Sequence, residues 1–292
     1  MLNKGLNTKQ VGNLFNVDES TVRRWALSGK IKCSSSAGGH RKFSYKDLIK
    51  FSFDNNIKLN KNKDSSKLSQ ASICNKIVKP ALEHNHKPIE KLLVELYLSG
   101  FSLASIMDDY VEKSLVKIQK KLDNKSITVA EEHIARKIVS QALGNFKQAV
   151  SNEEAFNGKN ILCLNLENDI PDLPIDMIEI LLRDINYNVH NCGSHTSIKD
   201  ITNLLSNKSY EAIFIYLCDR QCCTSTLIDH IDKTNNDLKQ IANLGEKYNI
   251  RLFLGGPYFK NIDKDTLKKY KTFKKYSEVI KLIKWFNLNY CH

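Results

Sequence analysis

The sequence predicts a multidomain fold in three parts: a helix-turn-helix head, a four-helix bundle, and an α/β doubly wound parallel sheet. Two short helical patterns separated by a turn open the chain. Apolar residues recur at helical spacing through the middle, and strand-like and helix-like segments alternate in the last third. With 292 residues, 41% of them hydrophobic, the chain is long enough to bury two or three separate cores.

The head begins with two predicted helices. Asn7 or Thr8 can cap the first, whose apolar residues fall on one face. Asp18 can cap a second helix over residues 19–28, and Gly29 would end it. This spacing is typical of a helix-turn-helix.

The second helix would present polar side chains to the major groove of DNA. Val22 and Trp25 are three residues apart, so they would face inward. The side chains that would meet phosphates and base edges are Ser20, Thr21, Arg23 and Arg24.

A two-stranded ribbon is predicted for residues 30–43, because this stretch is too rich in Ser and Gly for a helix interior. Its tip would be residues 34–38. The residues around this ribbon that would add contacts to DNA are Lys30, His40, Arg41 and Lys42.

The head, residues 1–55, resembles the winged helix-turn-helix of MerR-type transcriptional regulators. That family has the pattern Val-Ser-x-x-Thr-x-Arg-Arg-Trp followed by a Gly-Gly-His-Arg-x-Tyr wing. The matching residues here are Val17, Thr21 or Val22, Arg23, Arg24, Trp25, Gly38, Gly39, His40, Arg41 and Phe43. The resemblance implies a transcriptional regulator that binds a double-stranded DNA operator as a homo-oligomer, a dimer or higher.

Charge supports a polyanionic partner for the head. Residues 1–63 hold thirteen Lys or Arg against four Asp or Glu, a balance of +9 out of +12 for the whole chain. The sequence shows neither an 18-residue apolar run nor a signal peptide, which predicts a cytoplasmic protein without a membrane partner. The eight cysteines are expected to be free thiols.

The middle of the chain is predicted to be a linker followed by a bundle. Residues 56–87 are interpreted as a linker, with one short helix over residues 69–79 before Pro80. The bundle would span residues 88–152, with the helical pattern opening at Pro88. Its further predicted helices are residues 102–107, 108–122 and 128–146 or beyond.

Residues 158–292 are predicted to form a flavodoxin-type domain with its ligands at the carboxyl ends of the strands. The predicted strands are residues 160–165, 188–191, 212–217, 251–254 and 271–276. The predicted helices are residues 173–184, 197–207, 227–248 and 277–286.

The whole order resembles the cobalamin-dependent, light-sensing repressors of carotenoid genes. The MerR-type head, the bundle motif at residues 128–133 and the segment 254–259 carry the resemblance. It implies that adenosylcobalamin lies between bundle and sheet, with its cobalt held by a His in the loop after the first strand. Light would break the upper cobalt–carbon bond and alter the oligomer bound to DNA.

Three positions depart from that family's pattern. The alignment puts Pro171 where the cobalt-ligand His should be and Pro174 where a Gly should be, and Leu122 replaces the Trp that covers the upper ligand. Proline offers cobalt no donor nitrogen. The residues that match are Glu132, His133, Gly255 and Gly256. In that family the two glycines let the nucleotide tail of the cofactor approach the backbone. With the upper ligand gone, Glu132 and His133 are interpreted as a capping or packing pair.

These departures predict a cobalamin-binding-like module that has lost cobalamin and holds no cofactor. It would serve oligomerisation, a protein partner or another ligand, and the protein would not be an enzyme. Two alternatives stay open: a cobalamin-dependent regulator with unusual ligation, and a corrinoid carrier fused to a DNA-binding head.

A metal-, haem- or redox-sensing regulator is a further alternative. Two Cys/His groups follow the second and third predicted strands, so both fall at the edge where ligands bind. Free Cys is also a common core residue, and the first strand would separate the two loops, so no metal site is predicted. The candidates are His190, Cys192, His195, Cys218, Cys222 and Cys223.

Overall fold

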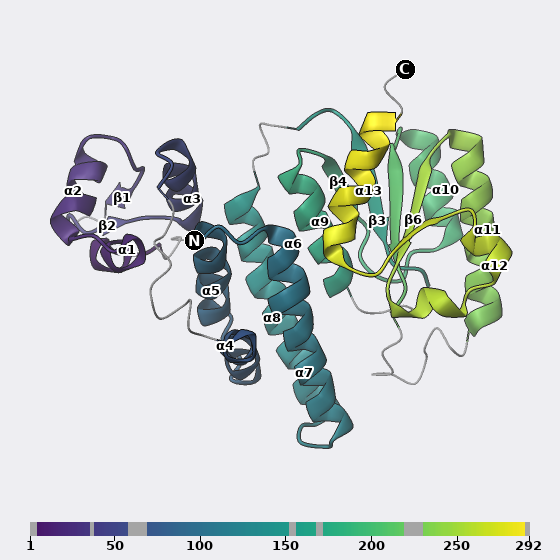
Figure 1. The fold of residues 1–292 in the computed structure, drawn as a ribbon, viewed down its shortest axis with the longest axis horizontal. Helices are drawn as coiled ribbons and strands as arrows, with labels where there is room; N and C mark the ends of the chain where they lie inside the picture. Colours follow the sequence, from purple (N-terminus) through teal and green to yellow (C-terminus); the bar gives the residue numbers. More distant parts are fainter. Residues whose placement is uncertain are drawn as a thin grey trace. The chain divides into compact units, whose positions relative to one another are not determined.

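The computed structural model describes residues 5–35, 38–57, 69–151, 156–167, 172–218 and 230–289. The chain divides into two compact units, Met1–Ser151 and Asn152–His292. The first is helical apart from one small ribbon, and the second contains a parallel sheet with helices on both faces (Figure 1). Among the helices of the described ranges, none has the length and apolar composition that a membrane span requires.

The two predicted helices of the head are present. Helix α1 (Thr8–Phe15) opens with a capping box, in which the Asn7 side chain accepts from the Gln10 amide and the Gln10 side chain accepts from the Asn7 amide, both at 2.8 Å. Asp18 is the residue before α2 (Glu19–Leu27), as predicted, but its side chain makes no capping bond.

A third helix, α3 (Tyr45–Asp54), completes the head and was missed by the sequence analysis. Ser44 caps it by accepting from the Asp47 amide at 3.1 Å. The ring of Phe51 on α3 lies 4.7 Å from the Trp25 ring and 5.7 Å from the Phe15 ring, so three aromatic side chains join α1, α2 and α3.

The ribbon consists of two short antiparallel strands. Ser34 pairs with Lys42, and Ser35 pairs with Arg41, between β1 (Ser34–Ser35) and β2 (Arg41–Lys42). The expected tip began at residue 34, whereas Ser34 and Ser35 belong to the first strand. Residues 36 and 37 lie outside the described ranges.

Part of the predicted linker is a bundle helix. Helix α4 (Gln70–Leu82) continues past Pro80, where a stop was expected, and packs against the other long helices. Pro80 has no amide to donate to the carbonyl four residues back, so α4 lacks that one hydrogen bond, and the helix ends two residues later. The apolar face of α4 is fully or almost fully buried: Ile73, Cys74, Ile77, Val78 and Ala81.

The rest of the helical region contains one irregular turn. The expected helices at residues 102–107 and 108–122 meet in a six-residue π-helix, η1 (Ile106–Val111). The Tyr110 carbonyl there accepts from the Ser114 hydroxyl at 2.6 Å and from the Cys74 thiol at 3.7 Å. The neighbouring helices are α5 (Lys87–Leu98), α6 (Leu103–Ser105), α7 (Glu112–Asp123) and α8 (Val129–Val150).

Within the first unit, the head rests on the bundle through α3, which packs against α5 and α8. The rings of Phe53 and Tyr97 lie 5.7 Å apart at this contact. The pKa of Tyr45 is raised, chiefly by burial and further by Glu90 and Glu95 of α5. The head is therefore attached by packing as well as by the chain.

The sheet has five parallel strands in the order β4-β3-β5-β6-β7. All five predicted strands are present. The strands are β3 (Asn160–Leu164), β4 (Asn188–Asn191), β5 (Ala212–Tyr216), β6 (Arg251–Gly255) and β7 (Lys271–Phe273).

Four predicted helices cover the sheet, and one short helix was not predicted. The helices are α9 (Leu173–Asp184), α10 (Ile198–Asn207), α11 (Ile231–Tyr248), α12 (Lys264–Leu267) and α13 (Tyr276–Asn289), with a 3-10 turn η4 (Pro257–Asn261). Figure 1 shows α10 and α11 on one face of the sheet and α9 and α13 on the other.

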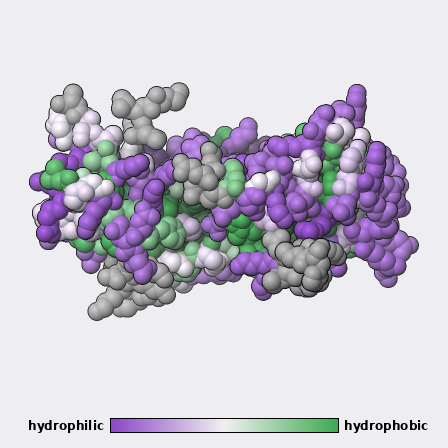
Figure 2. All heavy atoms as spheres, turned by 90° about the horizontal axis from the view of Figure 1, so that it is seen from above, coloured by the Kyte–Doolittle hydropathy of each residue, from purple (hydrophilic) through white to green (hydrophobic). Residues whose placement is uncertain are grey.

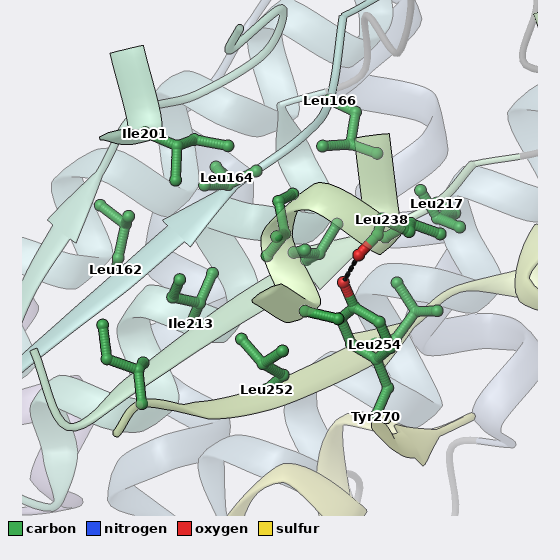
Figure 3. Packing of buried hydrophobic residues seen from close by; sticks show 14 of the residues in the cluster. Leu162, Leu164, Leu166, Ile201, Ile213, Leu217, Leu238, Leu252, Leu254 and Tyr270 are labelled. Atoms are coloured by element: carbon green, nitrogen blue, oxygen red, sulfur yellow. Dashed lines mark hydrogen bonds between the residues drawn. The ribbon is translucent and has the colours of Figure 1, made fainter. Parts of the chain in front are cut away.

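Alternating strand residues build a core on each face. Leu162, Leu164 and Leu254 point to the α10 and α11 side, where the Tyr270 hydroxyl donates to the Leu238 carbonyl at 2.6 Å (Figure 3). On the other face the rings of Phe214 and Phe253 stack 4.4 Å apart. The apolar runs of β3, β5 and β6, which are buried almost throughout, explain why this unit was predictable from sequence.

Candidate nucleic-acid interface and the carboxyl edge of the sheet

Helix α2 presents one apolar and one polar face. Val22 is fully buried, and Trp25 packs on Phe51. On the outward side Arg23 and Arg24 are exposed, as predicted. The inward and outward faces inferred from the i, i+3 spacing are therefore confirmed.

Local contacts distinguish the two arginines of α2. The Arg24 Nη2 group donates to the Thr21 hydroxyl at 3.2 Å, which restrains the guanidinium on the helix surface. Arg23 forms an exposed ion pair with Glu19 at 3.5 Å. Arg24 has no ion pair within the described ranges, so most of its five N–H donors remain available to a partner. The ion pair between Glu19 and Arg23 was not predicted, although their i, i+4 spacing is a signal for it.

An open hollow lies at the C-terminal end of α2. Gly29, with φ of 70°, ends the helix and turns the chain towards Lys30. Leu27 is 74% exposed there. The hollow is lined by Arg24, Trp25, Leu27, Ser28 and Lys30.

The ribbon carries the remaining predicted contacts. His40 and Lys42 are exposed, and Arg41 is half-buried. The ribbon is fixed to the head core, because Phe43 is fully buried and exchanges backbone hydrogen bonds with Leu6 at 2.8 and 2.9 Å. All eight predicted DNA-contact residues are thus at least partly exposed on one three-helix head.

In the bundle, the residues that match the cobalamin pattern take part in internal contacts. Glu132 is fully buried and forms a very close ion pair with Arg136, which also donates to Gln119 of α7 at 3.2 Å. His133 is partly exposed, with its Nε2 atom 3.9 Å from Glu132. Leu122 is half-buried on α7.

The capping role considered for Glu132 and His133 is wrong, because Glu131 caps this helix. The Glu131 carboxylate accepts from the Thr128 amide at 2.7 Å and from its hydroxyl at 2.8 Å. Both bonds lower the pKa of Glu131, and the bond from the Thr128 backbone amide has the larger effect. The packing role for Glu132 is observed in its contact with Arg136.

At the carboxyl edge of the sheet, the loop after β3 is bonded to the loop after β4. The Asn165 amide donates to the Gly193 carbonyl at 2.9 Å, and the Thr196 amide donates to the Asn165 carbonyl at 3.0 Å. Pro174 is buried in the first turn of α9. Pro171 lies outside the described residues.

The space beside the two glycines at the end of β6 is filled by other residues of the protein. A Cβ atom on Gly255 would lie 2.1 Å from the Phe273 ring, and one on Gly256 would lie 2.2 Å from the Leu217 carbonyl oxygen. Gly256 also has φ of 97°. Phe273 and Leu217 therefore occupy the Cβ direction of each glycine, so packing within the unit accounts for both glycines without a nucleotide tail.

The described members of the two Cys/His groups are held apart. In the sheet β3 lies between β4, which carries His190, and β5, which ends near the buried Cys218. Cys222 and Cys223 lie outside the described residues. Within the described ranges, no group of three or more His, Cys, Asp or Glu side chains is arranged to hold a metal ion.

The ring nitrogens of His190 are both engaged. Nδ1 lies 2.7 Å from the Tyr210 hydroxyl, and Nε2 lies 3.0 Å from the Lys208 ammonium. Burial, with Lys208 and Arg183, lowers the pKa of His190. For the half-buried Cys192 thiol, burial has the opposite effect and raises the pKa. His195 is exposed, and its backbone has a φ of 59°.

Comparison with known proteins supports both parts of the fold. Residues 6–51 match the family described as a helix-turn-helix domain. No curated protein matches the chain. The monomethylamine corrinoid protein of Methanosarcina barkeri is similar in structure, with a TM-score of 0.56 and 11% identity over 74% of this chain and 98% of that chain.

Two further solved structures have lower TM-scores. A cobalamin-binding protein from Desulfitobacterium hafniense DCB-2 has a TM-score of 0.35 and 12% identity over 73% of this chain and 98% of that chain. The methanol:cobalamin methyltransferase complex MtaBC of Methanosarcina barkeri has a TM-score of 0.36 and 13% identity, over 85% of this chain and 94% of that chain. The head is a helix-turn-helix domain, and the fold of the remainder is similar to that of a corrinoid protein.

Proposed function

We propose that this protein is a DNA-binding transcriptional regulator of the MerR type. The observation that carries the proposal is the polar face of α2, on which Thr21 holds an exposed Arg24 within a helix-turn-helix domain. A helix presented in this way fits the major groove, where arginine pairs with the edge of guanine.

The other basic residues would fix the head on the duplex. Arg23, Lys30 and Lys42 are exposed and would contact phosphates, which sets register without reading sequence. The β1-β2 ribbon would act as the wing. Ser20 and Thr21 would supply polar contacts, and His40 and Arg41 would extend the ribbon's contribution.

We also propose that the protein binds DNA as a dimer or larger homo-oligomer. A single head of three short helices offers a small interface, and regulators of this architecture gain affinity from paired half-sites. The bundle and the sheet would then serve as the oligomerisation or partner-binding module, with no catalytic role.

Selection from a random pool of duplex DNA tests the proposal. The full-length protein should enrich one sequence, and sedimentation should show two or more copies on it. A variant with Arg23, Lys30 and Lys42 changed to Gln should bind every duplex more weakly. The slope of its salt dependence should be shallower by about 0.9 for each phosphate that it no longer neutralises. A pool that stays random after repeated selection would refute the assignment.

For the module after the head, we propose that cobalamin binding has been lost. Three features support this: Phe273 and Leu217 occupy the space beside the two glycines, Glu132 is engaged by Arg136, and prolines stand at the positions of the ligand His and the Gly. The hard oxygen donors near Pro171, such as Asp172, are poorly matched to cobalt.

Operator binding should therefore be insensitive to adenosylcobalamin and to light. Binding curves measured in the dark, after illumination, and with or without the cofactor should superimpose. Absorbance of the purified protein gives a second readout that does not involve DNA. A corrin spectrum after purification, or a DNA complex that dissociates on illumination only with adenosylcobalamin, would contradict the proposal.

The reciprocal variant combines Pro171→His with Pro174→Gly. Recovery of corrin absorbance in this variant would mean that only the ligand was lost. Absence of recovery is the expected result, because the glycine space is already filled.

A further inference from the structure

Charge is strongly segregated within the second unit. Residues 152–259 contain nine Lys or Arg against fifteen Asp or Glu, a balance of −6, whereas residues 260–284 contain nine Lys against three Asp or Glu, a balance of +6. The unit as a whole therefore has no net charge. A protein with this distribution has a strong field at one surface that its net charge does not reveal.

The lysines of residues 260–284 surround one edge of the sheet. Strand β7 is the last in the sheet order and pairs only with β6. Helix α12, just before β7, packs against α11, and α13, just after it, packs against α9 on the opposite face. The segment from η4 to α13 thus wraps the β7 edge, and we call its lysines the lysine edge.

Most of the lysine edge is available to a partner. All nine side chains are exposed. Lys268 pairs with Asp265, and Lys269 pairs with Glu246 of α11. The lysines that form no ion pair within the described ranges are Lys260, Lys264, Lys274, Lys275, Lys281 and Lys284.

Protection of the sheet edge accounts for only part of this charge. Lysine on an edge strand discourages pairing with another chain. That reason applies to Lys271, which lies on β7 itself. It does not apply to Lys264 on α12 or to Lys281 and Lys284 on α13, which lie outside the strand.

The kind of partner follows from what accompanies the lysines. Membrane-binding surfaces add exposed apolar side chains that enter the lipid, and single-stranded nucleic acids are held by exposed aromatic rings. Among the residues whose side chains the structure describes, which in α13 end at Lys284, the large exposed hydrophobic residues all lie in the first unit, from Leu27 to Ile134. On its visible face the second unit is largely hydrophilic (Figure 2). Within the described side chains, the lysine edge therefore offers exposed lysine without large exposed hydrophobic residues, and exposed lysine suits the phosphate backbone of a duplex.

We propose that the lysine edge is a second DNA-contact surface, which binds the backbone of duplex DNA flanking the site contacted by the head. This inference rests on the proposed DNA-binding function. The head would bring flanking DNA to a high local concentration, so weak phosphate contacts by the lysine edge add to affinity. The acidic remainder of the unit repels the polyanion, so an approaching duplex would meet the unit at the lysine edge.

The test compares two duplexes, one limited to the site selected by the head and one extended by about two helical turns on each side. The full-length protein should bind the extended duplex more tightly, with a salt slope steeper by about two to four units, which corresponds to a similar number of phosphates. The edge variant carries Gln at Lys260, Lys264, Lys274, Lys275, Lys281 and Lys284.

The edge variant should bind both duplexes alike and should bind the extended one at least about tenfold more weakly than the unmodified protein does. A matched control makes the same change in net charge at other exposed lysines. The control positions are Lys76, Lys120, Lys121, Lys125, Lys137 and Lys199. The control should keep the preference for the extended duplex.

Three results would overturn the inference: equal binding of both duplexes by the unmodified protein, an equal loss in the control, or a loss by the edge variant on phosphatidylserine vesicles but not on DNA. Arg24→Ala separates this failure from that of the proposed function. If Arg24→Ala relaxes the preference at one base position while duplex length has no effect, only the lysine edge is refuted.

Discussion

Replacing Arg24 with Ala should weaken binding to the selected operator by about 1–3 kcal/mol, roughly 5- to 150-fold. Arg24 is exposed, is restrained by the Thr21 hydroxyl and has no ion pair within the described ranges. A guanidinium held in this way loses little conformational freedom when it pairs with a base edge. Equilibrium binding to the operator and to a variant with one altered base pair measures the effect.

Lys42→Ala is the matched control for Arg24→Ala. Lys42 is an exposed ribbon cation, so its loss should weaken all duplexes alike and reduce the salt slope by about one unit. Arg24→Ala should instead relax preference at one base position. If both variants weakened all sequences equally, Arg24 would be a phosphate contact and the base-reading role would fall.

Gly256→Ala should destabilise the second unit by about 3 kcal/mol or more. The new Cβ would lie 2.2 Å from the Leu217 carbonyl oxygen, and Gly256 adopts φ of 97° and ψ of 164°, a region open only to glycine. Leu217 cannot easily retreat, because its amide donates to the Gly255 carbonyl at 2.9 Å. Urea denaturation followed by circular dichroism measures the change.

Gly158→Ala provides the comparison in the same unit. Gly158 also has a positive φ, 76°, but a Cβ there would meet nothing within 4 Å. Its cost should be limited to the backbone strain, about 1–2 kcal/mol. Equal losses for the two substitutions would show that the contact with Leu217 contributes nothing.

The sheet was predictable because its strands are apolar runs between turn residues. Helix α9 matches the predicted bounds at residues 173–184, where a proline in the first turn and a periodic apolar face define it. Helix α3 was missed, although Ser44 as cap and Leu48 and Phe51 at helical spacing are signals for it. The predicted end of α4 at residue 79 was too early, because the helix continues through Pro80 to Leu82 although Pro80 cannot donate a backbone hydrogen bond.

For the candidate sites, the sequence predicted which residues are involved better than it predicted which side chains they contact. The exposed face of α2 followed from periodicity, but the bond between Thr21 and Arg24 depends on rotamers that spacing alone does not fix. The engagement of Glu132 by Arg136 and of Gly255 by Phe273 needed three-dimensional packing. The lysine edge was hidden because charge was summed over residues 64–292, where opposite regions cancel.

Phe273 and Leu217 make Gly255 and Gly256 intolerant of substitution on folding grounds alone. Any lineage that acquired a side chain at either position would lose the unit's packing before any change in binding could be selected. The glycine pair would therefore persist whether or not the unit binds a ligand. The Gly-Gly pair of this chain therefore carries information about how the unit packs, whatever the unit binds.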